Sequence, residues 1–148
     1  MGNRTLHYCY VVVGVMLVLT GGLFYILCRP STILINHIIS AMGLDSLLEV
    51  PRDWMRLHLM SSPWVYSLPA GLWSASYVTL SHAYTSRFSQ AERFAYASVI
   101  PLLGVVSELL QGVGAIPGTF DPIDLVCYVT PYLMYLILMC CFRKENLR

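Results

Sequence analysis

Charged residues are scarce in this chain: Asp, Glu, Lys and Arg together make up 11% of its 148 residues. Soluble domains carry about 25%, so this low share excludes a protein whose surface is covered by solvated charge. The chain also lacks a basic tail, which excludes the usual electrostatic signature of a nucleic-acid-binding protein. Hydrophobic residues make up 57% and lie in several long runs, which indicates an integral membrane protein.

Motifs for catalysis and metal binding are missing as well. The sequence has no H-E-x-x-H, no G-x-S-x-G and no phosphate-binding histidine or arginine motif. Its histidines are scattered, without the spacing of metal ligands; they are His7, His37, His58 and His82. We therefore predict neither a metal nor a cofactor. Whether the protein is an enzyme stays open, and the missing motifs favour a protein without catalytic activity.

The cysteines show no C-x-x-C spacing, and their odd number and irregular positions do not predict a disulfide framework. They are Cys9, Cys28, Cys127, Cys140 and Cys141. The last two precede Arg143 and Lys144, where acylation at a membrane surface would be chemically reasonable. We favour the simpler interpretation that these small thiols fill helix surfaces.

Four long apolar segments cover about 8–28, 64–84, 94–113 and 123–142. Each approaches the ~20 residues that a helix needs to cross ~30 Å of hydrocarbon. The first exceeds the h-region of a signal peptide and has no A-x-A site after it, so we expect it to be retained. The second is rich in serine, which predicts contacts with other helices rather than with lipid all round. We predict an all-α, polytopic bundle of four transmembrane helices forming a single domain, residues 1–148.

Basic residues predict the orientation of this bundle. If the four spans alternate, six of them fall on one side: Arg4, Arg87, Arg93, Arg143, Lys144 and Arg148. The other side has Arg29, Arg52 and Arg56, mixed with acids in a long loop. We therefore expect both termini in the cytoplasm.

The long first loop, about 29–63, contains apolar residues at helical spacing. Ile35, Ile38, Ile39 and Met42 follow this pattern, which predicts a short helix in the outer membrane interface, ended by Gly43. A second apolar segment, 44–50, runs up to a proline.

Two prolines are expected to shape the long helices. Pro69 fits the first turn of the second span, or kinks that helix if it already starts at Trp64. Gly71 and Trp73 follow on the same span, where small residues allow close helix approach. Pro131 lies near the middle of the fourth span and predicts a kink there.

The stretch SELLQGVGAIPGTFDPIDL, residues 107–125, places three acids at the outer end of the third and fourth spans. Glu108 lies about one to two turns below the surface, and Gln111 shares its helical face. An ionisable residue at this depth is a functional hypothesis by default. The alternative is a protonated Glu108 that only ties helices together through Gln111 or a hydroxyl of the second span.

The two aspartates have a structural explanation of their own. Asp121 suits the N-cap of the fourth helix, Pro122 its first position and Asp124 its third, near the positive end of the helix dipole. The glycine-rich loop 112–120 keeps the two helix ends close. Glu108, Gln111, Asp121 and Asp124 are therefore candidates for one polar pocket, which would divide acid and base roles, bind a cation or receive a lipid headgroup.

These residues resemble the signature of the VanZ-like family: Glu108-Leu109-Leu110-Gln111, a Gly/Pro loop, then Phe120-Asp121-Pro122-Ile123-Asp124-Leu125. The segment Leu68-Pro69-Ala70-Gly71-Leu72-Trp73 is similar to the start of that family's preceding helix. The chain looks closest to a group of small bacterial membrane proteins allied to VanZ, in which an Arg-Pro pair like Arg29-Pro30 follows the first helix. It departs from the family pattern at 118–119, where an arginine is usual, and at Tyr128, where an asparagine is usual.

The resemblance implies a helical protein of the bacterial cell envelope that lies in the inner (cytoplasmic) membrane. VanZ, after which the family is named, is associated with resistance to teicoplanin-type lipoglycopeptides. The first function we consider is binding of a membrane lipid, a lipid-linked cell-wall precursor or a lipoglycopeptide in the acidic pocket. A small accessory subunit is the second, its acids meeting a basic residue of a membrane-protein partner. A membrane enzyme acting on lipid headgroups is the third, with Glu108 and Asp124 as acid and base and His58, His37 or a water-bound metal assisting.

Overall fold

The computed structural model describes residues 2–28, 34–59, 62 and 64–145, and their regular structure is entirely helical. The six helices in this part of the chain are α1 Gly2–Cys28, α2 Leu34–Ala41, α3 Asp45–His58, α4 Trp64–Tyr84, α5 Gln90–Gly112 and α6 Pro122–Glu145. The predicted all-α fold is therefore confirmed. The expected Arg29-Pro30 pair and Arg148 lie outside the described residues.

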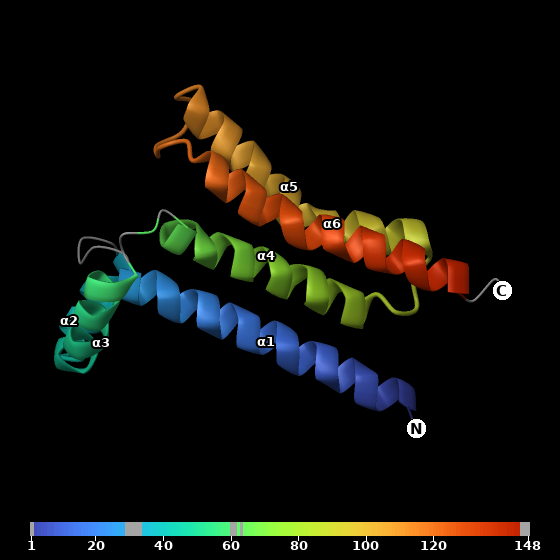
Figure 1. The fold of residues 1–148 in the computed structure, drawn as a ribbon, viewed down its shortest axis with the longest axis horizontal. Coiled ribbons are helices and arrows are strands. Elements are labelled where there is room, and N and C mark those ends of the chain that lie inside the picture. The colour runs from blue at the N-terminus through green and yellow to red at the C-terminus, as the bar shows by residue number, and fades with distance from the viewer. Residues whose placement is uncertain (1, 29–33, 60–61, 63, 146–148) are drawn as a thin grey trace.

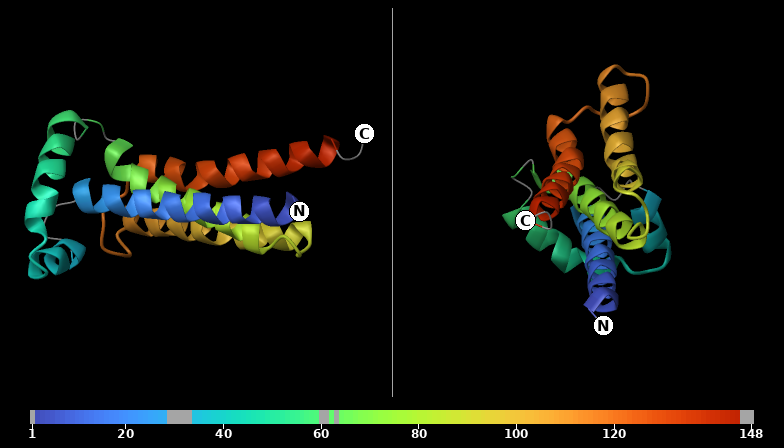
Figure 2. Two further views of the ribbon diagram at one scale, coloured as in Figure 1. Left: turned by 90° about the horizontal axis from the view of Figure 1, so that it is seen from below. Right: turned by 90° about the vertical axis from the view of Figure 1, so that its right-hand side faces the viewer.

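Four long helices run side by side, and two short ones sit across one end (Figure 1). Helix α4 contacts α1, α5 and α6, and α5 also contacts α6. The start of α1, the end of α6 and the α4–α5 connection lie at the same end of the bundle, as both Figure 1 and Figure 2 show. The α2–α3 pair and the α5–α6 loop lie at the opposite end.

Three helices are long and apolar enough to cross a membrane: Arg4–Cys28 of α1, Gln90–Gly112 of α5, and Pro122–Cys141 of α6. The most apolar 18-residue stretches of these helices have mean hydropathies of 2.5, 1.5 and 1.8. Helix α4 has 21 residues, is rich in serine, and is not among these three. The fold is thus that of a multi-pass membrane protein, with three helices in the described part of the chain able to span a membrane by length and composition.

Helix α4 lies at the centre because its polar side chains bond to neighbouring helices. Ser74 Oγ donates to the carbonyl of Tyr128 on α6 at 2.8 Å, and Ser76 Oγ donates to the carbonyl of Gly14 on α1 at 2.7 Å. Both serines are buried. The prediction that this segment contacts other helices rather than lipid all round is confirmed.

Glycines bring α4 close to its neighbours. A Cβ at Gly21 of α1 would stand 2.7 Å from the Trp73 ring, and one at Gly71 would stand 3.4 Å from Cys127 of α6. Real Cβ atoms essentially never come as close as the first distance, so Trp73 fits against α1 only because residue 21 has no side chain.

Prolines lie inside the long helices. Pro69 is an interior residue because α4 starts at Trp64, so its placement in a first helical turn was wrong and the alternative start at Trp64 is confirmed. Pro131 lies inside α6. Each proline lacks the N–H that would bond four residues back, which leaves a carbonyl without its helical partner.

The first loop forms a helical pair that packs on the end of α1. Helix α2 is the predicted short helix, and Gly43, with φ +70°, follows it. Helix α3 continues through its proline to His58. Arg52 Nη2 donates to the buried Asn36 Oδ1 at 2.8 Å, which joins α3 to α2, and Met55 packs with Cys28 of α1.

Candidate functional site

The ends of α5 and α6 are joined through a buried carboxylate. Glu108 is only 4% exposed, and its Oε2 accepts a hydrogen bond from the backbone N–H of Asp121 at 3.2 Å. The short loop therefore brings the two helix ends together as predicted. The partner is a main-chain amide rather than the Gln111 side chain or a hydroxyl of α4.

Asp121 caps helix α6. Its Oδ1 accepts the N–H of Ile123 at 2.8 Å, and α6 begins at Pro122. This is the N-cap arrangement predicted from the sequence. Asp124 follows as the third helical residue, and its Oδ1 is buried with no hydrogen-bond partner among the described residues.

Gln111 lies one turn beyond Ser107 and donates to its hydroxyl through Nε2 at 3.4 Å. The loop folds back against this side chain at Gly118, which has φ +141°. A Cβ at Gly118 would overlap the Gln111 amide. Only glycine therefore suits residue 118, both for its backbone conformation and for the space it leaves to Gln111.

These polar groups line a single cavity of about 830 Å³ at the end of the bundle that carries α2 and α3. Glu108, Gln111, Asp121 and Asp124 all contribute to its wall, so the structure brings the four predicted pocket residues together. Among the residues that the structure describes, its lining contains no Lys, Arg or His. The cavity is therefore rich in carboxylates and lacks an internal counter-charge.

Aromatic side chains form much of the remaining wall: Tyr25, Tyr66, Trp73 and Tyr128. They come from α1, α4 and α6, and the rings of Tyr25 and Trp73 lie 5.3 Å apart. Sequence reasoning missed the three tyrosines because no local pattern connects residues on separate helices. Tyr25 does follow Gly21 by one turn, and Gly21 makes room for Trp73.

Of the predicted packing and kink residues, Pro69 and Trp73 line this cavity. Gly71 packs against Cys127, and Pro131 lines a second cavity nearer the other end of the bundle. These two are therefore not part of the acidic site.

Carboxylates beside aromatic faces favour a cationic or hydroxyl-bearing ligand. Ammonium groups bind both carboxylates and the faces of Tyr and Trp rings. No group of three or more His, Cys, Asp or Glu is placed to hold a metal ion in the described part of the chain. Neither His37 nor His58 lines the cavity, and the His58 ring stacks on Trp54 instead.

Comparison of the chain with models of known protein families, with curated proteins and with solved structures finds no match.

Proposed function

We propose that this chain is a VanZ-like membrane protein of the bacterial cell envelope whose acidic cavity binds the headgroup of a lipid or a lipid-linked cell-wall precursor. The ligand group that fits best carries an ammonium together with hydroxyls. The observation that carries this proposal is the burial of Glu108 in a cavity with two further carboxylates and no basic residue.

Two carboxylate oxygens favour a ligand site over a purely structural role for the cavity. Glu108 has one main-chain donor at its Oε2, and the buried Asp124 Oδ1 has none. A buried polar atom without a partner costs about 1–3 kcal/mol. A ligand that donates to these oxygens recovers that cost, and the aromatic wall covers its apolar surface.

The proposed topology has four spans, because it adds α4 to the three apolar helices α1, α5 and α6. The α2–α3 pair lies in the outer interface. Helix α4 is 21 residues long and runs beside α1 over the length of the bundle, which supports a crossing despite its serines. Exposed apolar side chains on the short helices support the interfacial placement; they include Leu34, Ile38, Leu47, Val50 and Leu57. Both termini then lie in the cytoplasm, and the acidic cavity faces outward.

An accessory subunit remains the second candidate, because a basic side chain of a partner would equally supply the missing counter-charge. The enzyme hypothesis receives less support, since neither of its assisting histidines lines the cavity. We retain the link to teicoplanin-type resistance only as a consequence of the family resemblance.

The test replaces the two carboxylates separately by amides of the same shape, as Glu108→Gln and Asp124→Asn. We expect both variants to accumulate in the membrane while ligand retention falls roughly tenfold or more, since charged hydrogen bonds contribute about 1.5–3 kcal/mol. Native mass spectrometry of protein purified in mild detergent measures retained lipid, precursor or partner protein in one experiment.

Glu49→Gln is the matched control, because Glu49 is exposed on α3 and does not line the cavity. If the control loses as much ligand as the cavity variants, the site is elsewhere. Failure of both cavity variants to accumulate would assign the acids a purely structural role. A stoichiometric second protein in the wild-type sample would favour the subunit.

A further inference from the structure

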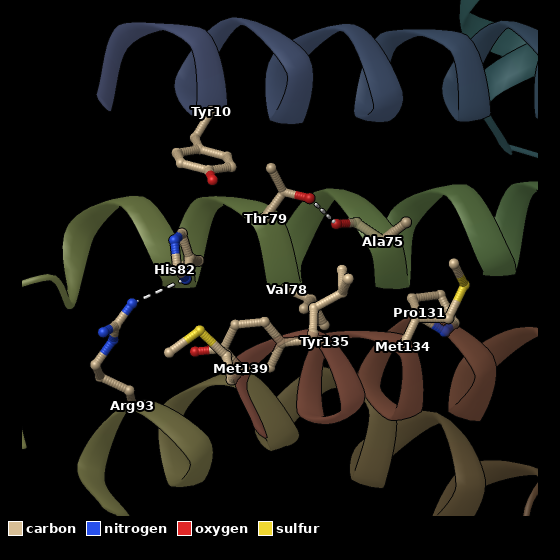
Figure 3. A pocket seen from close by; sticks show the side chains of 11 residues that line it. Tyr10, Ala75, Val78, Thr79, His82, Arg93, Pro131, Met134, Tyr135 and Met139 are labelled. Carbon is tan, nitrogen blue, oxygen red and sulfur yellow. Dashed lines mark hydrogen bonds between the residues drawn. The ribbon is translucent and has the colours of Figure 1, made fainter. Parts of the chain in front are cut away.

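A second cavity lies nearer the end of the bundle that carries the start of α1 and the end of α6. It has a volume of about 680 Å³ and lies between α4 and α6, with Tyr10 of α1 at its rim (Figure 3). Most of its wall is apolar and includes Val78, Met134 and Met139. The acidic site does not use this cavity, and the two share no lining residue.

One cation stands at the end of this apolar space. Arg93 of α5 reaches toward α4, and its Nη2 lies 2.9 Å from His82 Nδ1 (Figure 3). A guanidinium can only donate, so Nδ1 accepts and the His82 proton is on Nε2. His82 is therefore neutral in this contact and leaves the charge of Arg93 uncompensated.

The remaining surroundings of Arg93 contain rings and the neutral Tyr135 hydroxyl rather than acids. His82 lies between Tyr10 and Tyr135, with ring centroids 4.7 Å and 5.6 Å away. Glu92, beside Arg93 in sequence, is held by Ser89 in the capping box of α5. No carboxylate lies within ion-pair distance of Arg93 among the side chains that the structure describes.

The guanidinium also has an unused donor. Arg93 Nε is buried and has no hydrogen-bond partner in the described part of the protein. A buried donor of this kind, joined to an uncompensated positive charge, calls for an anionic acceptor. Inorganic phosphate alone would leave the apolar wall next to it unfilled.

We propose that this cavity binds one anionic phospholipid, with its phosphate on Arg93 and an acyl chain along the groove between α4 and α6. Arg93 is the fourth residue of α5, about 5 Å from the helix start, a depth that suits a headgroup phosphate. Met134 and Leu138 of α6 are more than half exposed, so a chain in the groove continues into the surrounding lipid.

The experiment titrates the detergent-purified, full-length protein with phosphatidylglycerol or with phosphatidylcholine of the same acyl chains, and counts bound lipid by native mass spectrometry. We expect one phosphatidylglycerol to bind roughly tenfold more tightly than phosphatidylcholine, because the choline ammonium neutralises the phosphate of phosphatidylcholine whereas phosphatidylglycerol keeps a net negative charge to offset Arg93. Arg93→Gln should remove this preference, and Arg93→Lys should keep most of it. Absence of any preference in the wild type would overturn the proposal.

Arg87→Gln is the matched control, because Arg87 is an exposed basic residue in the same region and does not line the cavity. An equal loss of preference in this variant would reduce the effect to general surface charge and refute the site. Soluble glycerol phosphate should fail to displace the lipid. Effective displacement would mean that the site takes free phosphate instead.

Met134→Trp keeps Arg93 and fills the groove. This variant tests acyl-chain binding in the groove even if Arg93→Gln fails to fold. The half-exposed position tolerates a larger side chain, and both lipids should bind at least several-fold more weakly. Unchanged binding of phosphatidylglycerol to this variant would show that the acyl chain lies elsewhere.

Discussion

At the scale of single residues, a glycine on α5 sets the distance between α5 and α6. A Cβ at Gly104 would overlap the ring of Tyr128, which lines the acidic cavity. Gly104 lies one turn before Glu108, so the contact that seats Tyr128 also fixes the wall beside the buried carboxylate. A close approach of this kind depends on the absence of a side chain at residue 104.

We predict that Gly104→Ala destabilises the protein by about 1–3 kcal/mol, the usual cost of overpacking a filled site. Gly22→Ala on α1 is the control, because a Cβ there meets nothing within 4 Å. The measurement is the midpoint of unfolding in a graded series of SDS and mild detergent. Equal midpoints for the two variants would show that Tyr128 moves aside without cost.

At the scale of elements, the start of α6 combines helix capping with the acidic site. Asp121 accepts the Ile123 N–H through its side chain, and its own N–H donates to Glu108. The same residue lines the cavity. Capping and ligand binding at this position can be separated because asparagine caps a helix nearly as well as aspartate.

We predict that Asp121→Ala lowers stability by about 1 kcal/mol, whereas Asp121→Asn leaves it nearly unchanged. If the Asp121 charge also contributes to the site, the asparagine variant should still lose ligand in native mass spectrometry. Full ligand retention by Asp121→Asn would restrict Asp121 to capping. Thermal unfolding in detergent gives the stability arm of the comparison.

The sequence was sufficient for the four long helices, for the short helix α2 and for the acidic end of the site, because these depend on local patterns, but it did not predict helix α3. Apolar runs locate the long helices, and the Asp121-Pro122-Ile123-Asp124 spacing identifies a helix start. The aromatic wall and the pairing of His82 with Arg93 depend instead on how α1, α4, α5 and α6 pack, which no local spacing encodes. Pro69 shows the same limit, since the sequence allowed two helix starts and the structure has the earlier one, with Val65 packed against Cys28 and Met55.

At the scale of the whole molecule, the two cavities lie toward opposite ends of one bundle. The acidic cavity is at the end with α2 and α3, and the Arg93 cavity is toward the end with the α4–α5 connection. The proposed topology places these ends on opposite sides of the membrane. That arrangement can be tested with one residue from each end.

We predict that Ser46→Cys on α3 reacts with a membrane-impermeant maleimide in intact bacterial cells, while Ser86→Cys between α4 and α5 reacts only after permeabilisation. Both serines are exposed, and the background replaces the five native cysteines by alanine. Labelling is read by the mass shift of the purified protein. Reaction of both variants in intact cells would contradict the proposed topology.

The position of Glu108 also has an electrical consequence. Glu108 lies about one turn, or roughly 6 Å, inside the end of α5, so in the proposed topology a cation that reaches it from outside crosses about a fifth of a ~30 Å membrane. Moving an elementary charge through the full field is worth about 2.3 kcal/mol per 100 mV, which makes this fraction worth about 0.5 kcal/mol. A negative-inside voltage therefore draws a cationic occupant into the cavity, and an energised cell holds it about twice as tightly as a de-energised one.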